Sequence, residues 1–354
     1  MNLADARIGY DGYSNDWRAP GDRRRFCAYA AGRGLTIEPA VVTREPDVVL
    51  VTHNGDIPGW TARKRRDGDR LKFIFELADS YLTQSGLARR YLKGTARYAL
   101  GVDSCLSPDF LATLEQACTV ADAVICSTSE QETMIRRFNP NVVVSFDWFG
   151  DDLGPAKRTF ARSGKLKLVW EGQSTTLHNL RSVRDILDDL RDAVELHVVT
   201  DPLIYRYFGR FAPHPAGDLL KDFRCDVHFH PWSRDSFSRH LVEADVAIIP
   251  IDPTDRFAMG KPENKLVMLW QLGLPVLTSD TPAYRRAMGG AGLDLLCADP
   301  AAWRTKLEAF IAAPAAEFEQ VARRGRDYAE RAYSKSEFAA RFDQAFAAAG
   351  LSLR

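Results

Sequence analysis

Two lysines near the start of an expected helix are the strongest chemical signal in the sequence. The segment 258–273 reads AMGKPENKLVMLWQLG and contains Lys261, Asn264 and Lys265. We expect a helix over about residues 264–272, stopped by a following glycine and proline. Two ammonium groups beside free helix N–H donors suit a leaving diphosphate, on which negative charge builds up. The alternative is that both lysines are solvated, although a lysine at a helix start opposes the helix dipole.

A second phosphate-type signal is a glycine turn in the middle of the chain. Gly172, Gln173, Ser174 and Thr175 follow an expected strand over residues 166–171 and precede an expected helix. A helix that starts at such a turn aims backbone N–H groups and its positive dipole end at an anion. The alternative is that Ser174 or Thr175 only caps a helix after a tight turn.

General-base candidates follow two expected strands of the first half. The strand over residues 47–52 ends before His53 and Asp56, and the strand over residues 72–76 ends near Asp79. An imidazole or carboxylate there could take a proton from an attacking hydroxyl group. A lone histidine at a strand end is, however, more often a hydrogen-bonded structural residue.

A polar loop over residues 10–25 closes with Gly21 and enters a helix that carries Arg23, Arg24 and Arg25. Three consecutive helical residues cannot all face one way, so at most one or two of these arginines could contact a ligand. We take Gly21 and Arg23 as the candidates for a phosphate or acceptor loop and expect the other arginines to be solvated.

Short apolar runs alternate with helical patterns along the whole chain, which predicts an α/β fold with parallel, doubly wound sheets. The expected strands cover residues 6–10, 36–40, 47–52, 72–76, 123–127, 142–145, 166–171, 195–200, 227–230, 246–250, 275–278 and 294–297. Expected helices of the first half cover residues 23–33, 86–100, 109–120 and 130–137.

The strand pattern restarts at residue 165, after a connection rich in glycine, proline and charge, and this predicts two Rossmann-like domains. We expect an N-terminal, acceptor-side domain over residues 1–155 and a C-terminal, donor-side domain over residues 163–330. A helix break around residues 333–336 suggests that a last helix, about 335–354, packs back on the first domain. Ligands of such sheets bind beyond the carboxyl ends of the strands, so two sheets facing each other would form a cleft there.

Composition excludes several classes of function. The 354 residues carry 47 Lys and Arg against 47 Asp and Glu, so no overall field recruits nucleic acid. The six cysteines form no CxxC pair, which predicts buried thiols in a reducing cytoplasm. The start lacks the pattern of a signal peptide, and no apolar stretch could span a bilayer.

Residues 51–100 hold ten Lys and Arg against five Asp and Glu, including the run RKRR at 63–66. This basic lobe could rest on the anionic inner face of a membrane, or it could only be solubilising surface. We therefore expect a cytoplasmic protein with at most peripheral membrane contact.

The segments around the two phosphate-type signals resemble GT-B glycosyltransferases related to glycosyltransferase group 1, also called family 4-like. The resemblance rests on NKL followed by WQLGLPV and a Ser-Asp pair, on WEGQSTTLHNLRSV at 170–183, and on ADAVICSTSEQETMIRRF at 121–138. It implies that Asn264, Lys265 and Leu266, with the turn at residues 172–175, hold the diphosphate of a nucleotide-sugar. It also implies that the loop 230–232 lies near the base, where Trp232 could stack, although a packing role is equally open.

The resemblance implies transfer of a sugar to a glycan or lipid-linked acceptor in cell-surface polysaccharide synthesis. Helix ends and lysines would replace a divalent metal at the diphosphate, and no DxD motif stands in a plausible site, so we expect no cofactor and no metal. Many relatives carry two glutamates eight positions apart, and here Gly260 and Met268 align with them; Glu263 is the nearby candidate substitute. Two alternatives are therefore kept. One is a GT-B-like sugar-nucleotide epimerase, and the other is a non-catalytic sugar-nucleotide-binding partner of another transferase.

Overall fold

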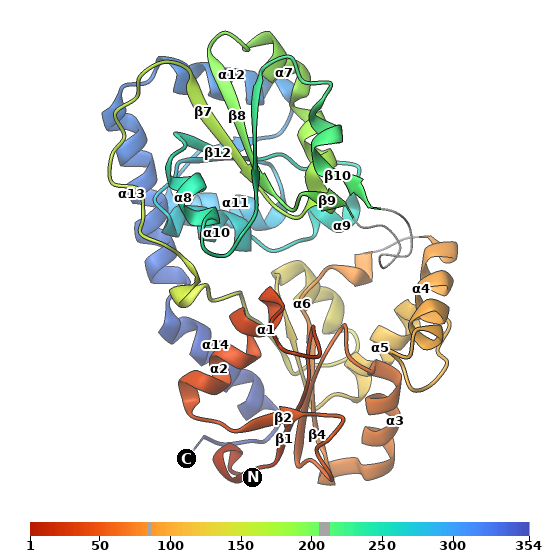
Figure 1. Cartoon of the computed structure of the whole chain (residues 1–354). Helices are drawn as coiled ribbons and strands as arrows, with labels where there is room; N and C mark the ends of the chain where they lie inside the picture. Colours follow the sequence, from red (N-terminus) through yellow and green to blue (C-terminus); the bar gives the residue numbers. More distant parts are fainter. Residues whose placement is uncertain (84–85, 205–212, 354) are drawn as a thin grey trace. The chain divides into compact units, whose positions relative to one another are not determined.

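The computed structural model describes residues 1–83, 86–204 and 213–353 and divides them into two compact units (Figure 1). The N-terminal unit comprises Met1–Trp148, Gly260–Pro262 and Ser334–Arg354, and the C-terminal unit comprises Phe149–Met259 and Glu263–Tyr333. Each unit contains a six-stranded parallel sheet, which confirms the predicted α/β class with two Rossmann-like, doubly wound sheets. The functional assignments, acceptor side and donor side, stay predictions.

The sheet of the N-terminal unit has the strand order β2-β1-β3-β4-β5-β6. Apart from the exposed edge strand β2, these strands are almost wholly buried, as expected for apolar runs covered on both faces. Their bounds are β1 Ile8–Asp11, β2 Ile37–Pro39, β3 Val48–Thr52, β4 Lys72–Leu77, β5 Ala123–Cys126 and β6 Val142–Val144.

In the part of this unit that the structure describes, the sheet is accompanied by the α-helices α1 Pro20–Arg24, α2 Phe26–Arg33, α3 Ile57–Asp67, α4 Leu87–Ala99, α5 Phe110–Val120, α6 Ser129–Ile135 and α14 Lys335–Ala348. The last helix, α14, buries Phe338, Phe342 and Phe346 in the core of this unit. Phe342 stacks on Tyr29 of α2, with ring centres 4.9 Å apart. Aromatic residues spaced four apart on one helix face thus hold the end of the chain to the N-terminal unit.

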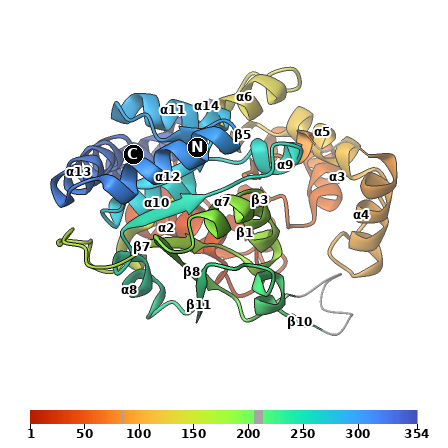
Figure 2. The same cartoon turned by 90° about the horizontal axis from the view of Figure 1, so that it is seen from above.

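The sheet of the C-terminal unit has the strand order β11-β8-β7-β12-β13-β14, and β11 lies at its edge beside β8 (Figure 2). The strands are β7 Leu166–Glu171, β8 Val194–Thr200, β11 Asp226–Pro231, β12 Val246–Ile249, β13 Val276–Ser279 and β14 Leu296–Cys297, with a separate antiparallel pair, β9 Leu203–Ile204 and β10 His214–Pro215. The α-helices of this unit are α7 Arg184–Asp189, α8 Phe237–Val242, α9 Arg256–Met259, α10 Asn264–Gln271, α11 Pro282–Ala291, α12 Pro300–Ala312 and α13 Ala315–Ala332.

Two helix predictions need correction, and one helix was missed. The helix expected over residues 23–33 is two helices, because Arg25 leaves helical geometry at φ −126° and ψ −114°. The helix expected after Gly172 begins as a 3₁₀ segment, η5 Ser174–Ser182, before α7. Helix α3, which contains the RKRR run, was not predicted at all. The helix start at Asn264 and the break between α13 and α14 are confirmed.

Among the described residues, no helix combines the length and the apolar composition that crossing a bilayer requires.

Candidate functional site

Lys265 and the Gly172 turn, which lie far apart in the sequence, meet in the C-terminal unit. Lys265 lies in the first turn of α10, and its ammonium donates a hydrogen bond to the main-chain oxygen of Glu171 at the end of β7. The same ammonium lies 5.0 Å from the ring centre of Trp170. A Cβ atom on Gly172 would stand only 2.6 Å from the Lys265 Nζ atom. The absence of a side chain at residue 172 therefore makes room for the cation at this strand end.

The turn after Gly172 lines a pocket of about 420 Å³, whose wall is formed by Gln173, Ser174, Thr175, Asp201, Pro202 and Leu203. Gln173 and Thr175 are exposed, whereas the buried Ser174 donates its hydroxyl to the Leu203 main-chain oxygen at 2.9 Å. Neither Ser174 nor Thr175 caps the segment, because the N-cap position is Gln173, without a side-chain hydrogen bond. The capping interpretation is therefore wrong, and Ser174 fixes the pocket wall instead.

Asp201 is a residue of this pocket that sequence analysis missed. It follows β8 directly, and one of its carboxylate oxygens lies 3.5 Å from the backbone nitrogen of Ser174. Its position after an apolar strand was the available signal. The pocket thus has an acidic side at Asp201, while the cation of Lys265 lies beside Gly172.

Trp232 follows the edge strand β11, and its backbone nitrogen donates to the Thr200 oxygen at 2.8 Å. Its half-buried ring stacks on Phe237, with ring centres 5.6 Å apart and planes 28° apart. One face of the indole therefore packs inside the unit, and stacking of a nucleotide base on Trp232 stays a prediction.

The residues around the start of α10 differ in what they can offer a ligand. Glu263, at the N-cap, accepts a 2.5 Å hydrogen bond from the Tyr333 hydroxyl. Burial together with this carboxylate raises the pKa of Tyr333 well above its ordinary value. The Leu266 side chain is wholly buried, so only its backbone could meet a diphosphate, and Asn264 is the first helical residue. A role for Glu263 as a substitute glutamate stays a prediction.

His53, Asp79 and Lys261 come together in the N-terminal unit. The His53 Nε2 atom lies 3.6 Å from one oxygen of Asp79, and the Lys261 ammonium lies 3.9 Å from the other oxygen. His53 is only 4% exposed and has edge contacts with the rings of Tyr13 and Tyr81. Within the described residues its Nδ1 atom has no hydrogen-bond partner.

Burial lowers the pKa of His53 well below its ordinary value, and the positive charges of Lys93 and Arg97 add to this effect. The imidazole is therefore neutral at neutral pH and can accept a proton. Asp79, about one third exposed, is the carboxylate that would stabilise the imidazolium formed. Nε2 faces Asp79 and Nδ1 is enclosed, so an acceptor would reach the imidazole only after a side chain moves; the role of a general base stays a prediction.

Asp56, the third base candidate, is the N-cap of α3. Its carboxylate accepts hydrogen bonds from the backbone nitrogens of Gly59 and Ser104, at 3.1 Å and 3.0 Å. The side chain thus stabilises a helix start that sequence analysis did not predict.

The polar loop at residues 10–25 is organised internally. A Cβ atom on Gly21 would stand 2.7 Å from the Tyr13 ring, so the glycine admits that ring. Arg23 donates to the main-chain oxygen of Arg18 at 3.1 Å. Contact of Gly21 or Arg23 with a phosphate or acceptor stays a prediction.

Arg25 is not solvated as we expected, because it is 1% exposed and ion-paired inside the N-terminal unit. Its guanidinium donates to Glu76 at 2.6 Å and to Asp147 at 3.1 Å. Burial raises the pKa of Glu76 above its ordinary value, and Arg25 opposes that rise. A glutamate at the end of the apolar strand KFIFE was the signal in the sequence for a buried ion pair.

Comparison with solved structures places this arrangement in a known fold. The chain is similar to HepE from Anabaena in complex with UDP-glucose, with a TM-score of 0.62, 10% identity, and coverage of 97% of this chain and 99% of HepE. It is similar to a sucrose-phosphate synthase from Thermosynechococcus elongatus, with a TM-score of 0.57, 13% identity, and coverage of 91% of this chain and 75% of the synthase.

TarM from S. aureus also matches, with a TM-score of 0.58, 9% identity and coverage of 84% of this chain; the match spans about half, 54%, of TarM. These likenesses confirm the GT-B fold. No family model and no curated protein sequence matches the chain.

Proposed function

We propose that the protein transfers a glycosyl group from a nucleotide-sugar to an acceptor hydroxyl, with the donor bound by the C-terminal unit. The contact between the Lys265 ammonium and the Glu171–Gly172 strand end carries this proposal. The glycine turn makes room for this cation, and an ammonium group is a suitable partner for the oxygens of a diphosphate. Lys265 would stabilise the negative charge on the leaving diphosphate as the glycosidic bond breaks. Neither a cofactor nor a divalent metal is part of this mechanism.

UDP is the nucleotide that we propose first. HepE was solved with UDP and with UDP-glucose, TarM was solved with UDP, and a similar trehalose-phosphate synthase from Burkholderia vietnamiensis is described as UDP-forming. These likenesses lie at 14% identity or less, so they favour a UDP-sugar without fixing the hexose.

For the acceptor step we propose His53 as the base and Asp79 as the group that stabilises it. A neutral imidazole takes the hydroxyl proton while the acceptor oxygen attacks the anomeric carbon, and the nucleoside diphosphate leaves with the bonding electrons. This sequence of events inverts the anomeric centre. A retaining transfer would not need such a base, so the stereochemistry of the product separates the two.

We propose that the acceptor is a glycan or a lipid-linked saccharide in polysaccharide synthesis, reached at the inner face of a membrane. Helix α4 exposes Leu87 by 68%, Tyr91 by 48% and Leu92 by 71%, and apolar residues that are exposed together mark a candidate contact surface. Part of the basic lobe serves internal ion pairs, since Arg90 binds Asp109 and the buried Arg97 binds Asp103. Co-sedimentation with anionic vesicles, compared between wild type and L87S/L92S, tests this contact, and equal binding by both would reject it.

A non-catalytic nucleotide-sugar-binding role is the alternative with a specific observation behind it. Met268, at one of the two positions where relatives carry glutamate, is 4% exposed and packed in the core, and Gly260 occupies the other. A GT-B-like epimerase is the remaining alternative. Incubation with UDP-sugars separates the three: release of UDP supports transfer, an epimerised donor supports the epimerase, and binding without turnover supports the non-catalytic role.

The donor site is tested first by thermal unfolding with UDP, GDP, ADP, CMP and TDP. A nucleotide at about 100 times its dissociation constant should stabilise the fold by about 2.7 kcal/mol. Lys265→Ala should abolish the shift, whereas Lys221→Ala, at an exposed lysine of the same unit, should retain it. If no nucleotide stabilises the wild type, the proposed donor site is wrong.

A further inference from the structure

A cluster of histidines lies on one face of the edge strands β8 and β11, apart from the proposed donor chemistry. His197 of β8 and His228 of β11 are directly opposite each other in the parallel register. Glu195 lies two residues before His197, and His230 lies two residues after His228, so both are on the same face. Alternate residues of a strand share a face. The opposite face of β8 carries Leu196 and Val198 and lies in the core of the unit, so the cluster occupies the other side.

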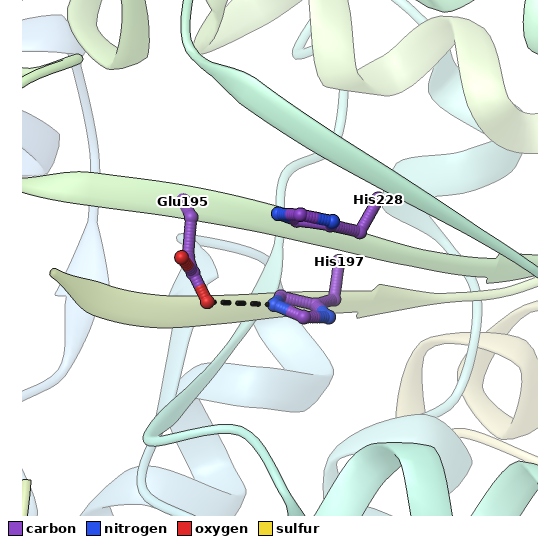
Figure 3. Close-up of side chains that lie close together, drawn as sticks. All are labelled: Glu195, His197 and His228. Carbon is purple, nitrogen blue, oxygen red and sulfur yellow. Dashed lines mark hydrogen bonds and ion pairs between the residues drawn. The ribbon is translucent and has the colours of Figure 1, made fainter.

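Three of these side chains have ligand atoms that converge. One ligand atom from each of Glu195, His197 and His228 lies within 4.8 Å of the other two (Figure 3). The His197 Nε2 atom lies 3.0 Å from a Glu195 oxygen, and the His197 and His228 rings are stacked with centres 4.7 Å apart. Imidazole nitrogens with a carboxylate oxygen are the ligand types that zinc and neighbouring transition metals take in proteins.

We propose that Glu195, His197 and His228 bind one divalent transition-metal ion of the zinc class at the edge of the C-terminal sheet. Tetrahedral ligands at about 2.0–2.1 Å from the metal stand roughly 3.4 Å apart. The 3.0 Å contact between Glu195 and His197 must therefore widen, and any ligand atoms up to 4.8 Å apart must come closer. His228 is exposed and Glu195 is half-buried, which leaves both side chains room to turn. Three protein ligands leave the fourth position to water.

The surroundings of His197 fit a metal ligand. When the metal takes Nε2, the remaining proton resides on Nδ1, which lies 3.0 Å from the Nε2 atom of His230 and can donate to it. Such an outer hydrogen bond fixes the tautomer and the ring orientation of a ligating histidine. The His230 ring in turn stacks on His240 of α8, with centres 4.4 Å apart. Lys167, whose ammonium is 3.7 Å from Glu195, is the group that would compete with the metal.

The bound ion would tie the edge strand to its neighbour. In the sheet order of the described residues, β8 is the one strand that pairs with β11. Ligands from both strands would add a second link across this pair. Such a link would stabilise the strand pair whether or not the protein transfers a glycosyl group.

The test uses the full chain, freed of metal with a chelator and titrated with Zn²⁺ in a calorimeter, with bound metal counted after gel filtration. We expect one ion per chain. When Co²⁺ replaces zinc, its absorption spectrum should be that of a site with nitrogen and oxygen ligands. His228→Asn should weaken binding by at least tenfold, and His230→Gln by about 10–100-fold. His214→Asn, which changes an exposed histidine on β10, should bind as the wild type does.

His228 is exposed, so its replacement tests the site even if His197→Asn fails to fold. The proposal is overturned if the wild type binds no ion, or if His228→Asn binds zinc as tightly as the wild type. It is also overturned if His214→Asn weakens binding as much as His228→Asn, since binding would then be unspecific. Nucleotide binding is measured separately, so failure of the donor site would leave this result unaffected.

Discussion

Lys265 donates its ammonium hydrogen to the main-chain oxygen of Glu171, a residue 94 positions earlier in the chain. The contact joins the first turn of α10 to the carboxyl end of β7. The sequence of neither element predicts this pairing. It depends on the neighbouring Gly172, because any Cβ atom there would stand 2.6 Å from the lysine nitrogen and 3.1 Å from the Trp170 ring.

Gly172→Ala should therefore displace the lysine and weaken donor binding. The added methyl group cannot share space with the ammonium, and a lysine pushed away from the turn no longer meets the diphosphate. We expect UDP affinity to fall at least tenfold, or about 1.4 kcal/mol, in calorimetric titration. Gly217→Ala is the matched control, since its Cβ atom would meet nothing within 4 Å. Unchanged affinity in Gly172→Ala would remove the turn from the donor site.

His53→Gln tests the proposed base. The pKa of His53 is lowered well below its ordinary value of 6.5, so the imidazole is already neutral at that pH. Activity of the wild type should thus persist below that pH and decline only as the pH falls through the lowered pKa. The substitution should reduce kcat by about 10²–10⁴-fold and remove this acid limb, while UDP binding is kept. An unchanged kcat would point to a retaining transfer without a protein base.

The strands and the helix α10 were predictable because their signals are local. Apolar runs and stop residues are read within about ten residues, and Lys265 was placed correctly at a helix start. Long-range pairing was not readable. Arg25 breaks its helix because Glu76 and Asp147, both distant in the sequence, hold its side chain inside.

Strand alternation contained a signal that we did not use. His197 follows Glu195 by two residues, and His230 follows His228 by two, which places each pair on one strand face. Whether the two pairs lie opposite each other depends on the register between β8 and β11. The sequence of one strand alone does not determine that register. The expectation of no metal did not take these two pairs into account.

The Tyr333–Glu263 hydrogen bond should contribute to stability rather than to transfer alone. It joins the end of α13 to the N-cap of α10 with an oxygen–oxygen distance of 2.5 Å. A hydrogen bond to a charged group contributes about 1.5–3 kcal/mol, so Tyr333→Phe should lower the free energy of unfolding by about that amount. In a double-mutant cycle with Glu263→Gln, measured by urea unfolding, the two losses should not add. Full additivity would mean that the pair is not coupled.

Lys93 should make stability depend on pH above neutrality. Its ammonium lies 3.5 Å from the ring centre of Tyr81 and 4.0 Å from that of Phe110. Burial lowers the pKa of Lys93 from 10.5 to about 7, with Arg97 adding to the shift. Between about pH 7 and pH 10.5, Lys93 keeps its proton in the unfolded chain but has lost it in the folded chain. The free energy of unfolding therefore rises as the pH rises from about 7 towards 10.5.

Lys93→Met removes this titration, so the free energy of unfolding of the variant should lack that part of the rise with pH. The variant should be stabilised most relative to the wild type below about pH 7, where the folded wild type must hold a buried charge. Urea unfolding at several pH values measures the difference between the two curves. Lys221→Met is the control, because Asp218 raises the pKa of that exposed lysine instead of lowering it. If wild type and Lys93→Met run parallel across this range, then the ammonium of Lys93 is solvated and its contacts with the two rings do not persist in solution.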